Sequence, residues 1–197
     1  MPPILLASSS PYRRELLARL GLPFSHQAPA LDETRLAGEP AQAMVMRLAE
    51  AKARALAAQY PGHLIIGSDQ AAVLALPGAE AQVLGKPGHF EAALAQLQAC
   101  SGQVVSFLTG LALLDARSGQ CQVDCVPFSV HLRQLDTAAL TRYLHAETPY
   151  DCAGSFKAEG LGVSLFERTE GEDATSLIGL PLIRLVRMLQ NCQVQVP

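Results

Sequence analysis

"PILLASSSPYRRELLARLG", residues 3–21, contains an apolar run, a serine turn and a helix-like segment in immediate succession. The run at 3–7 predicts a short buried strand. Ser10 followed by Pro11 is typical of a helix start, because serine caps the helix and proline fits its first position. Gly21 predicts the end of that helix. A strand that leads directly into a helix favours an α/β fold.

Two cations in this helix break the usual charge pattern. Arg13 and Arg14 occupy its first turn, where the partial positive charge of a helix start favours acidic side chains. A bound polyphosphate would reverse the sign of that interaction, so both arginines are candidate phosphate ligands. For Arg14, an orientation toward solvent or an ion pair with an acid is the alternative.

The rest of the chain interleaves helical and strand-like segments. Residues 63–76 predict a buried strand that stops at a polar break and is followed by another apolar run. "ARSGQ" predicts a hairpin between two long strands, and together these features favour an α/β fold with a mixed β-sheet. The predicted helices span 40–59, 90–100 and 137–146, with a last one beginning at Pro181, and the long strands are 104–115 and 121–135.

Composition limits the class of protein. The chain has 197 residues, 49% of them hydrophobic and 17% charged, so we expect one folded domain spanning 1–197. A net charge of −3 is unlike that of proteins that coat nucleic acid, so no nucleic-acid partner is expected. The five scattered cysteines predict free thiols. With no signal peptide or membrane span in the sequence, we expect a cytoplasmic location and no membrane partner.

Lys52 interrupts the apolar stripe of the predicted helix at 40–59. Val45, Leu48 and Leu56 repeat at helical spacing, and Lys52 falls among them on the same face. Such a lysine either extends its ammonium to solvent or meets an anion. Lys52 is therefore a candidate ligand for a phosphate group.

Two further polar residues occupy positions where ligands are often bound. Asp69 follows the buried run "LIIGS", and ligands of open α/β sheets collect beyond the carboxyl ends of strands. A carboxylate there can hold a metal or accept a proton from water. Lys86 lies in the stiff loop "LGKPG" (84–88), which lacks the spacing of a P-loop. The alternative for both residues is an ordinary turn position.

These residues combine into a set of cations and acids that suits a polyphosphate bound with a divalent metal. Histidines show no metal-site spacing, and Asp115, Glu147 and the acidic run 170–173 are interpreted as solvated turns or helix ends. The cations are Arg13, Arg14, Lys52 and Lys86, and the candidate metal-binding acids are Asp32, Glu33 and Asp69.

Seven segments carry most of these residues in a defined order. They are "ILLASSSPYRREL", "LDET", "RLAEAKARAL", "IIGSDQ", "LGKP", "CAGSFKAEGLGVSLFERTEG" and "GLPL". In this order they resemble the motifs of the Maf family of nucleoside triphosphate pyrophosphatases, over nearly the whole chain. "GSDQ" and "CAGSFKAEG" are similar to the 7-methyl-GTP pyrophosphatase subgroup.

The resemblance implies an elongated mixed β-sheet with flanking helices and two lobes around a cleft, as in the inosine triphosphate pyrophosphatases. It implies cleavage between the α- and β-phosphates with Mg²⁺ or Mn²⁺, and a homodimer. Asp69 matches the proton acceptor, and Glu33 and Asp69 match metal-binding positions. The matched substrate-binding residues are Ser8, Arg13, Lys52 and Lys86.

The resemblance also implies that Tyr12, Gln70 and Glu159 select the base. Glu159 offers two acceptor oxygens to the N1–H and N2–H₂ donors of guanine, and a carboxylate and an aromatic ring both favour the cationic 7-methylguanine. We therefore expect hydrolysis of 7-methyl-GTP. The alternatives are the same chemistry on dTTP, UTP or another modified nucleotide, and a nucleotide-sensing division regulator with little turnover.

Two features depart from the family pattern. Tyr12 takes a position where the subgroup has tryptophan, which keeps an aromatic ring. The segment "ALPGAEAQ" (75–82) is an extra turn between Asp69 and Lys86, which we expect on the rim of the cleft, where it would affect substrate entry.

Overall fold

The computed structural model describes residues 1–76, 78 and 81–196, so the extra turn at 75–82 lies partly outside the described residues. The chain forms two compact units. Unit 1 comprises Met1–Gln70, Thr109–Val126 and Asp173–Pro197, and unit 2 comprises Ala71–Leu108 and Pro127–Glu172.

Both units combine strands and helices, and three long strands contribute residues to both. These strands are β3 (Leu64–Leu74), β5 (Val104–Asp115) and β6 (Cys121–Leu132). Unit 1 adds β1 (Ile4–Leu6), β2 (Phe24–His26), α1 (Pro11–Ala18), α2 (Ala41–Ala55), α5 (Ala174–Ile178) and α6 (Leu182–Asn191). Unit 2 adds β4 (Gln82–Leu84), β7 (Phe166–Gly171), α3 (Phe90–Cys100), α4 (Thr137–Glu147) and the 3₁₀ turns η1 (Ala153–Ser155) and η2 (Leu161–Leu165).

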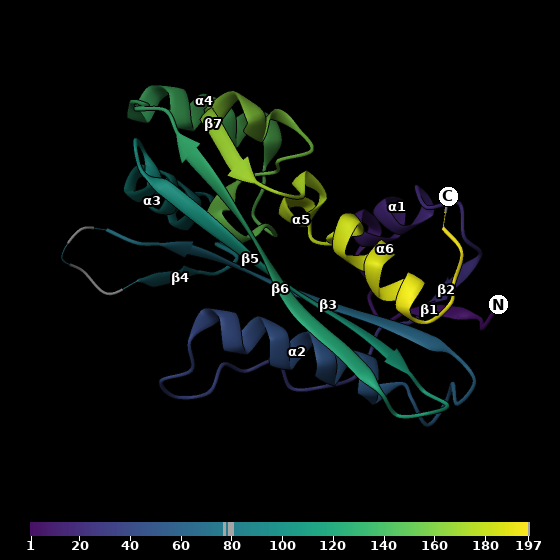
Figure 1. The fold of residues 1–197 in the computed structure, drawn as a ribbon. Coiled ribbons are helices and arrows are strands. Elements are labelled where there is room, and N and C mark those ends of the chain that lie inside the picture. The colour runs from purple at the N-terminus through teal and green to yellow at the C-terminus, as the bar shows by residue number, and fades with distance from the viewer. Residues whose placement is uncertain (77, 79–80, 197) are drawn as a thin grey trace. The chain divides into compact units, whose positions relative to one another are not determined.

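The strands form a seven-stranded sheet in the order β2-β1-β3-β5-β6-β7, with β4 paired to β3. β1 runs parallel to β2 and β3, whereas β4 is antiparallel to β3 and β7 is antiparallel to β6. Figure 1 shows the long strands and the helices beside them. The mixed sheet confirms the predicted α/β class.

β3 differs from its prediction in a way that matters for function. It is one continuous strand from Leu64 to Leu74, so Asp69 lies inside the strand, and the prediction that it follows a strand end is wrong. The polar residues on either side of Asp69 can lie inside the strand because their side chains have hydrogen-bond acceptors there. The Ser68 hydroxyl lies 2.9 Å from the carbonyl oxygen of Gly110. The Gln70 amide donates to the carbonyl oxygen of Ser176 at 2.8 Å.

The two faces of the unit 1 sheet pack against different helices, because successive side chains of a strand point to opposite sides. Leu5 and Ile65 share a core with residues of α2. Leu6 and Ile66 share another with residues of α1 and α6, and Figure 1 shows these helices across the strands from α2. Each leucine or isoleucine buried in this way contributes about 1.5–3 kcal/mol.

Two glycines bring α2 unusually close to the sheet. A Cβ atom at Gly67 would lie 2.0 Å from the carbonyl oxygen of Ala49, and one at Gly110 would lie 2.1 Å from that of Val45. The helix backbone therefore packs directly on the strand backbones. Asp69 is two residues beyond Gly67 and so shares its face, which points the carboxylate toward α2.

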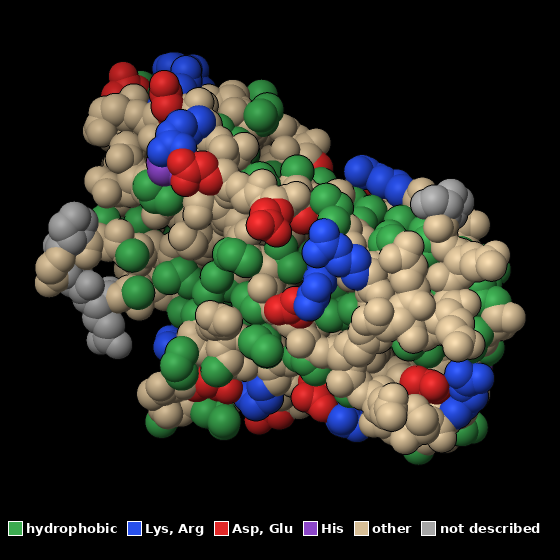
Figure 2. All heavy atoms as spheres, viewed as in Figure 1, with side chains coloured by type: hydrophobic (Ala, Val, Ile, Leu, Met, Phe, Trp, Pro, Cys, Tyr) green, Lys and Arg blue, Asp and Glu red, His purple; other side chains and the backbone are tan. Residues whose placement is uncertain are grey.

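The other elements follow the predictions in most respects. α2 ends at Ala55, earlier than predicted, because the chain turns after it, and the short helix α5 was not predicted. All five cysteines are free. Among the described residues no helix is long and apolar enough to cross a membrane. On the face shown in Figure 2, lysine and arginine side chains are interspersed with acidic ones.

Candidate active site

The serine turn before α1 is held by its own hydroxyl groups. Ser8 Oγ accepts a hydrogen bond from the Ser10 amide at 3.1 Å, and Ser10 Oγ caps the helix by accepting from the Arg13 amide at 3.3 Å. Pro11 is the first helical residue, as predicted, and no acidic residue occupies the first turn. The helix start therefore keeps its partial positive charge available to an anion.

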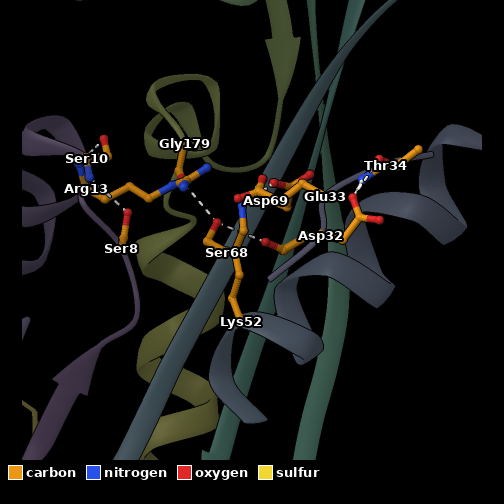
Figure 3. Close-up of polar contacts among 11 residues, drawn as sticks. Ser8, Ser10, Arg13, Asp32, Glu33, Thr34, Lys52, Ser68, Asp69 and Gly179 are labelled. Carbon is orange, nitrogen blue, oxygen red and sulfur yellow. Dashed lines mark hydrogen bonds and ion pairs between the residues drawn. The ribbon is translucent and has the colours of Figure 1, made fainter. Parts of the chain in front are cut away.

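Arg13 extends from this helix to the turn after α5. Its Nε donates to the carbonyl oxygen of Gly179 at 2.8 Å, and the Ser68 hydroxyl lies 2.9 Å from the same oxygen (Figure 3). Gly179 has a φ of +119°, and a Cβ there would lie 3.4 Å from Arg13 Nε. Glycine at this position therefore allows both the backbone conformation and the close approach of the guanidinium.

Burial lowers the pKa of the Arg13 guanidinium, and the carboxylates of Asp69 and Glu33 act in the opposite direction. Arg13 is thus within electrostatic reach of Asp69 and Glu33, two of the three acids that the sequence suggests as metal ligands. The side chain is partly buried, so its interactions with these acids are less screened than those of a fully exposed arginine.

Lys52 lies at the centre of the site. Its Nζ donates to Glu33 Oε2 and to Asp69 Oδ1, both at 2.7 Å (Figure 3). The Lys52 side chain is 8% exposed and that of Asp69 is 12% exposed, whereas that of Glu33 is 53% exposed. Of the two predicted alternatives for Lys52, extension to solvent and contact with an anion, the structure shows contact with an anion. Its partners in the structure are carboxylates.

The loop that carries Glu33 is braced by its neighbours. Asp32 Oδ1 accepts from the hydroxyl and the amide of Thr34 at 2.6 and 2.9 Å. The Thr34 hydroxyl bond and then the backbone bond lower the pKa of Asp32. Arg47 of α2 binds both carboxylate oxygens of Glu39, at 2.6 and 2.7 Å. Asp32 therefore stabilises the loop through Thr34. Of the two neighbouring acids Asp32 and Glu33, it is Glu33 that contacts Lys52.

Glu33 and Asp69 fit a divalent cation by their chemistry. Their carboxylates converge on one point, Lys52 Nζ, and carboxylate oxygens are preferred ligands of Mg²⁺ and Mn²⁺. Among the described residues there is no cluster of three or more acidic, histidine or cysteine ligands. A cation here would therefore complete its coordination with phosphate oxygens or water.

Comparison with known proteins identifies the family to which this chain belongs. The family profile described as Maf-like protein matches residues 3–192. The chain belongs to the Maf family.

Relatives of this Maf-family chain align along its entire length. Proteins named 7-methyl-GTP pyrophosphatase from Pseudomonas syringae pv. tomato and Pseudomonas aeruginosa are 66% and 60% identical, each over 100% of both chains. A protein of the same name from Alcanivorax borkumensis is 54% identical over 100% of this chain and 97% of its own.

Unit 1 of the Maf-family chain contains most of the predicted site. Ser8 is buried in the serine turn, and Gln70 donates from its amide to Thr109 Oγ1 at 3.0 Å and to the Ser176 and Leu177 carbonyls. Tyr12 is partly buried on α1. The residues that contacts and charge interactions join directly are Arg13, Glu33, Lys52 and Asp69.

Arg14 has a partner that was not predicted. Its Nη1 lies 3.2 Å from Nε2 of His26. Its Nε is buried and has no hydrogen-bond partner among the described residues. Neither predicted alternative, free solvent exposure or an ion pair with an acid, matches this contact, and Arg14 keeps an unused donor at the helix start.

Unit 2 contains Lys86 and Glu159, which are both exposed. In the described part of the chain neither side chain makes a hydrogen bond or an ion pair. Lys86 follows β4, and Glu159 precedes η2, so each belongs to a loop of this unit. Their charged groups are available to a ligand.

Two acids predicted to be solvated are in fact buried or partly buried. Asp173 is 3% exposed and is held by amide and hydroxyl donors. Glu147 accepts from the Leu161 amide at 2.6 Å and lies 3.8 Å from Lys157 Nζ. The capping position of Asp173 before α5 was the signal available in the sequence, and no comparable local signal marks Glu147.

Proposed function

We propose that this protein hydrolyses 7-methyl-GTP to 7-methyl-GMP and pyrophosphate. The observation that carries the chemistry is the buried Asp69 carboxylate held at one oxygen by Lys52, next to Glu33, in a Maf-family chain. The substrate assignment is supported by the names of full-length relatives at 54–66% identity.

Asp69 is proposed as the base. Lys52 occupies its Oδ1, and no hydrogen bond from a described residue reaches Oδ2. Oδ2 is therefore the oxygen that would orient a water molecule, take its proton and direct it at the α-phosphorus. Lys52 fixes the carboxylate in place, so the acceptor oxygen does not have to be ordered during the reaction.

The charge balance supports a requirement for a divalent cation. The carboxylates of Glu33 and Asp69 and the cations of Lys52 and Arg13 sum to zero formal charge, so a triphosphate needs additional positive charge. Mg²⁺ or Mn²⁺ held by Glu33 and Asp69 would supply it by neutralising charge on the phosphate oxygens. Lys52 would then turn from Glu33 toward the phosphates and keep its bond to Asp69.

The phosphate groups are proposed to bind at the start of α1. Amide groups of the serine turn and the first helical turn provide donors, and Arg13 adds charge-assisted hydrogen bonds from the guanidinium nitrogens that Gly179 does not use. Arg14, in the first turn of the same helix, is a further candidate. Lys86, an exposed cation of unit 2, is the candidate that the family resemblance adds.

Recognition of the base is assigned to Glu159, with Tyr12 and Gln70 as further contributors. A carboxylate pairs with the two donors on the guanine edge, and methylation at N7 makes that base cationic. A pyrimidine lacks the donor pair and would leave the carboxylate without partners, at a cost in transition-state binding. This argument favours 7-methyl-GTP over dTTP and UTP.

The decisive experiment measures pyrophosphate release from 7-methyl-GTP, GTP, dTTP, UTP and ITP with Mg²⁺. We expect kcat/KM to be at least about tenfold higher for 7-methyl-GTP, and a chelator to abolish turnover. Asp69→Asn should lower kcat about 10³-fold, since it removes the base and keeps the shape. Asp115→Asn, at an aspartate paired with Arg117, is the matched control and should leave kcat unchanged.

Each other outcome points to a different reading. A preference for dTTP or UTP would show that 7-methyl-GTP is the wrong substrate, while the cleavage between the α- and β-phosphates would still hold. Nucleotide binding without pyrophosphate release would favour a sensor. Near-normal turnover by Asp69→Asn would contradict the assigned base.

A further inference from the structure

Asp173 is a buried carboxylate to which the proposed mechanism gives no part. It is 3% exposed, and its charge is balanced by hydrogen bonds. Oδ1 accepts from the amide and the hydroxyl of Thr175, at 2.9 and 2.5 Å, and Oδ2 accepts from the Ile183 amide at 2.8 Å. A single side chain thus joins the start of α5 to the start of α6.

These bonds continue into the turn between the two helices. The Thr175 carbonyl oxygen accepts from the amides of Gly179 and Leu180, both at 3.3 Å. The Thr175 hydroxyl in turn accepts from the Leu182 amide at 2.9 Å. The position of the Gly179 peptide therefore depends on Thr175, and the position of Thr175 depends on Asp173.

The carbonyl groups at the end of α5 hold side chains from other segments of unit 1. The Gly179 oxygen accepts from Arg13 Nε at 2.8 Å and lies 2.9 Å from Ser68 Oγ. The Ser176 oxygen accepts from Gln70 and from Thr109, at 2.8 and 2.9 Å. Because a helix C-terminus carries partial negative charge, it is a suitable anchor for a guanidinium.

We propose that Asp173 is a positioning residue for phosphate binding, which fixes the Gly179 carbonyl so that Arg13 presents its remaining donors to the substrate. This inference rests on the proposed role of Arg13 in binding phosphate. Without Asp173 the turn loses its ties to α5 and α6, and Arg13 loses the fixed acceptor that orders its side chain. The loss then falls on substrate affinity, because no group that contacts the reacting water has changed.

The test is a double-mutant cycle between Asp173→Asn and Arg13→Met. The asparagine side chain has one oxygen and one NH₂ group, so its NH₂ group faces the backbone N–H of either Ile183 or Thr175. Two donors cannot bond to each other, so the hydrogen bonds on that side are lost. We expect KM for 7-methyl-GTP to rise about five- to tenfold with kcat within about threefold, and Arg13→Met to raise KM at least about tenfold. In the Arg13→Met background, Asp173→Asn should change KM less than about twofold.

The dissociation constant of inorganic tripolyphosphate, measured by calorimetry with Mg²⁺, separates this inference from the proposed function. It should follow the same non-additive pattern even if another nucleotide proves to be the substrate. An unchanged constant in Arg13→Met would refute the phosphate role of Arg13 itself. A full Asp173→Asn effect in the Arg13→Met background, or an effect on kcat alone, would refute positioning.

Matched variants distinguish positioning from a general loss of capping. Asp136 caps α4 by accepting from the Ala139 amide at 2.7 Å, and Asp136→Asn should leave both constants unchanged. If Asp173→Asn does not fold, Thr175→Val carries the test, because it removes the hydroxyl that joins Asp173 to the Leu182 amide. Thr175→Val should raise KM, whereas Thr175→Ser keeps the hydroxyl and should have a KM close to that of the wild type. Equal KM values for the two variants would contradict the proposal.

Discussion

The two units hold their candidate site residues in opposite states. In unit 1, Lys52 and Asp69 are buried and bonded to each other. In unit 2, Lys86 and Glu159 are exposed, and among the described residues neither has a hydrogen-bond or ion-pair partner. Packing fixes a buried pair in one geometry, whereas an exposed charge can adapt. The buried pair of unit 1 is thus suited to holding a fixed geometry, and the exposed charges of unit 2 are suited to adapting to a ligand.

The strongest test of this contrast is Lys52→Met, which leaves the buried Asp69 carboxylate without its partner. Lys52 is a preorganised donor at the proposed base, and loss of such a donor costs about 10²–10³ in kcat, so we expect kcat/KM to fall at least about 10²-fold. We expect kcat to fall and KM to rise, since Lys52 holds the proposed base and is proposed to move toward the phosphates. Steady-state pyrophosphate release measures both.

Arg54→Met is the matched control on the same helix. Arg54 pairs with Glu50 at 2.6 Å, but the two side chains are 49% and 36% exposed. Exposed pairs at this helical spacing contribute only about 0.3–0.5 kcal/mol, so kcat/KM should stay within about twofold. Equal losses for the two variants would remove the distinction between buried and exposed pairs.

Glu159→Gln is expected to have a smaller effect on kcat/KM than Lys52→Met, because the substitution alters only the proposed recognition of the base. The neutral amide should bind the cationic base less well, which narrows the preference for 7-methyl-GTP over GTP by about three- to tenfold. The ratio of kcat/KM values for the two nucleotides is the measurement. Glu167→Gln, at an exposed glutamate of β7, should leave that ratio unchanged. An unaltered ratio in Glu159→Gln would exclude Glu159 as the selector.

The smallest effect on turnover is expected from Glu39→Gln, at an acid that braces a loop. Hydrogen bonding to Arg47 lowers the pKa of Glu39 from its ordinary value of 4.5 to about 2. A lowered pKa stabilises the folded state above about pH 4.5, and that contribution disappears as the pH falls toward 2. The Tm of the wild type should therefore exceed that of Glu39→Gln at pH 7, and the difference should vanish near pH 2.

Turnover of Glu39→Gln at neutral pH should stay within about threefold of the wild type. A difference in Tm that is the same at pH 7 and pH 2 would show that the ion pair does not cause it. A large loss of turnover would place this outer loop among the groups on which the chemistry depends.

Lys52 shows how far the sequence alone can predict this site. Its place in an apolar stripe is a local property, and helical periodicity was sufficient to find it. The serine cap of α1 and the two cations in its first turn were found in the same way. These predictions needed no information about residues distant in the chain.

Asp69 and Asp173 show where such prediction stops. The run Ser68–Gln70 is typical of a strand end by its sequence, but remote groups satisfy its polar side chains: Asp69 is held by Lys52, and Ser68 and Gln70 bind groups of residues 109–110 and 176–179. Partners supplied by remote segments leave no periodic pattern in the local sequence. Asp173 is a different case, because its partners Thr175 and Ile183 are close in the sequence and its capping position is a local signal. The acidic, glycine-containing segment around it nevertheless predicts a solvated turn, whereas Asp173 is buried.

Gly67 and Gly110 limit how this chain can change during evolution. Neither glycine carries a chemical group, yet each removes a Cβ that would collide with the α2 backbone. The first methyl group added at either position would push α2 away and take Lys52 out of reach of Asp69. A lineage can exchange an exposed residue such as Glu159, the proposed selector of the base, in a single step. The spacing of α2 can change only if helix and strand change together, so substrate preference can diverge while the reaction stays the same.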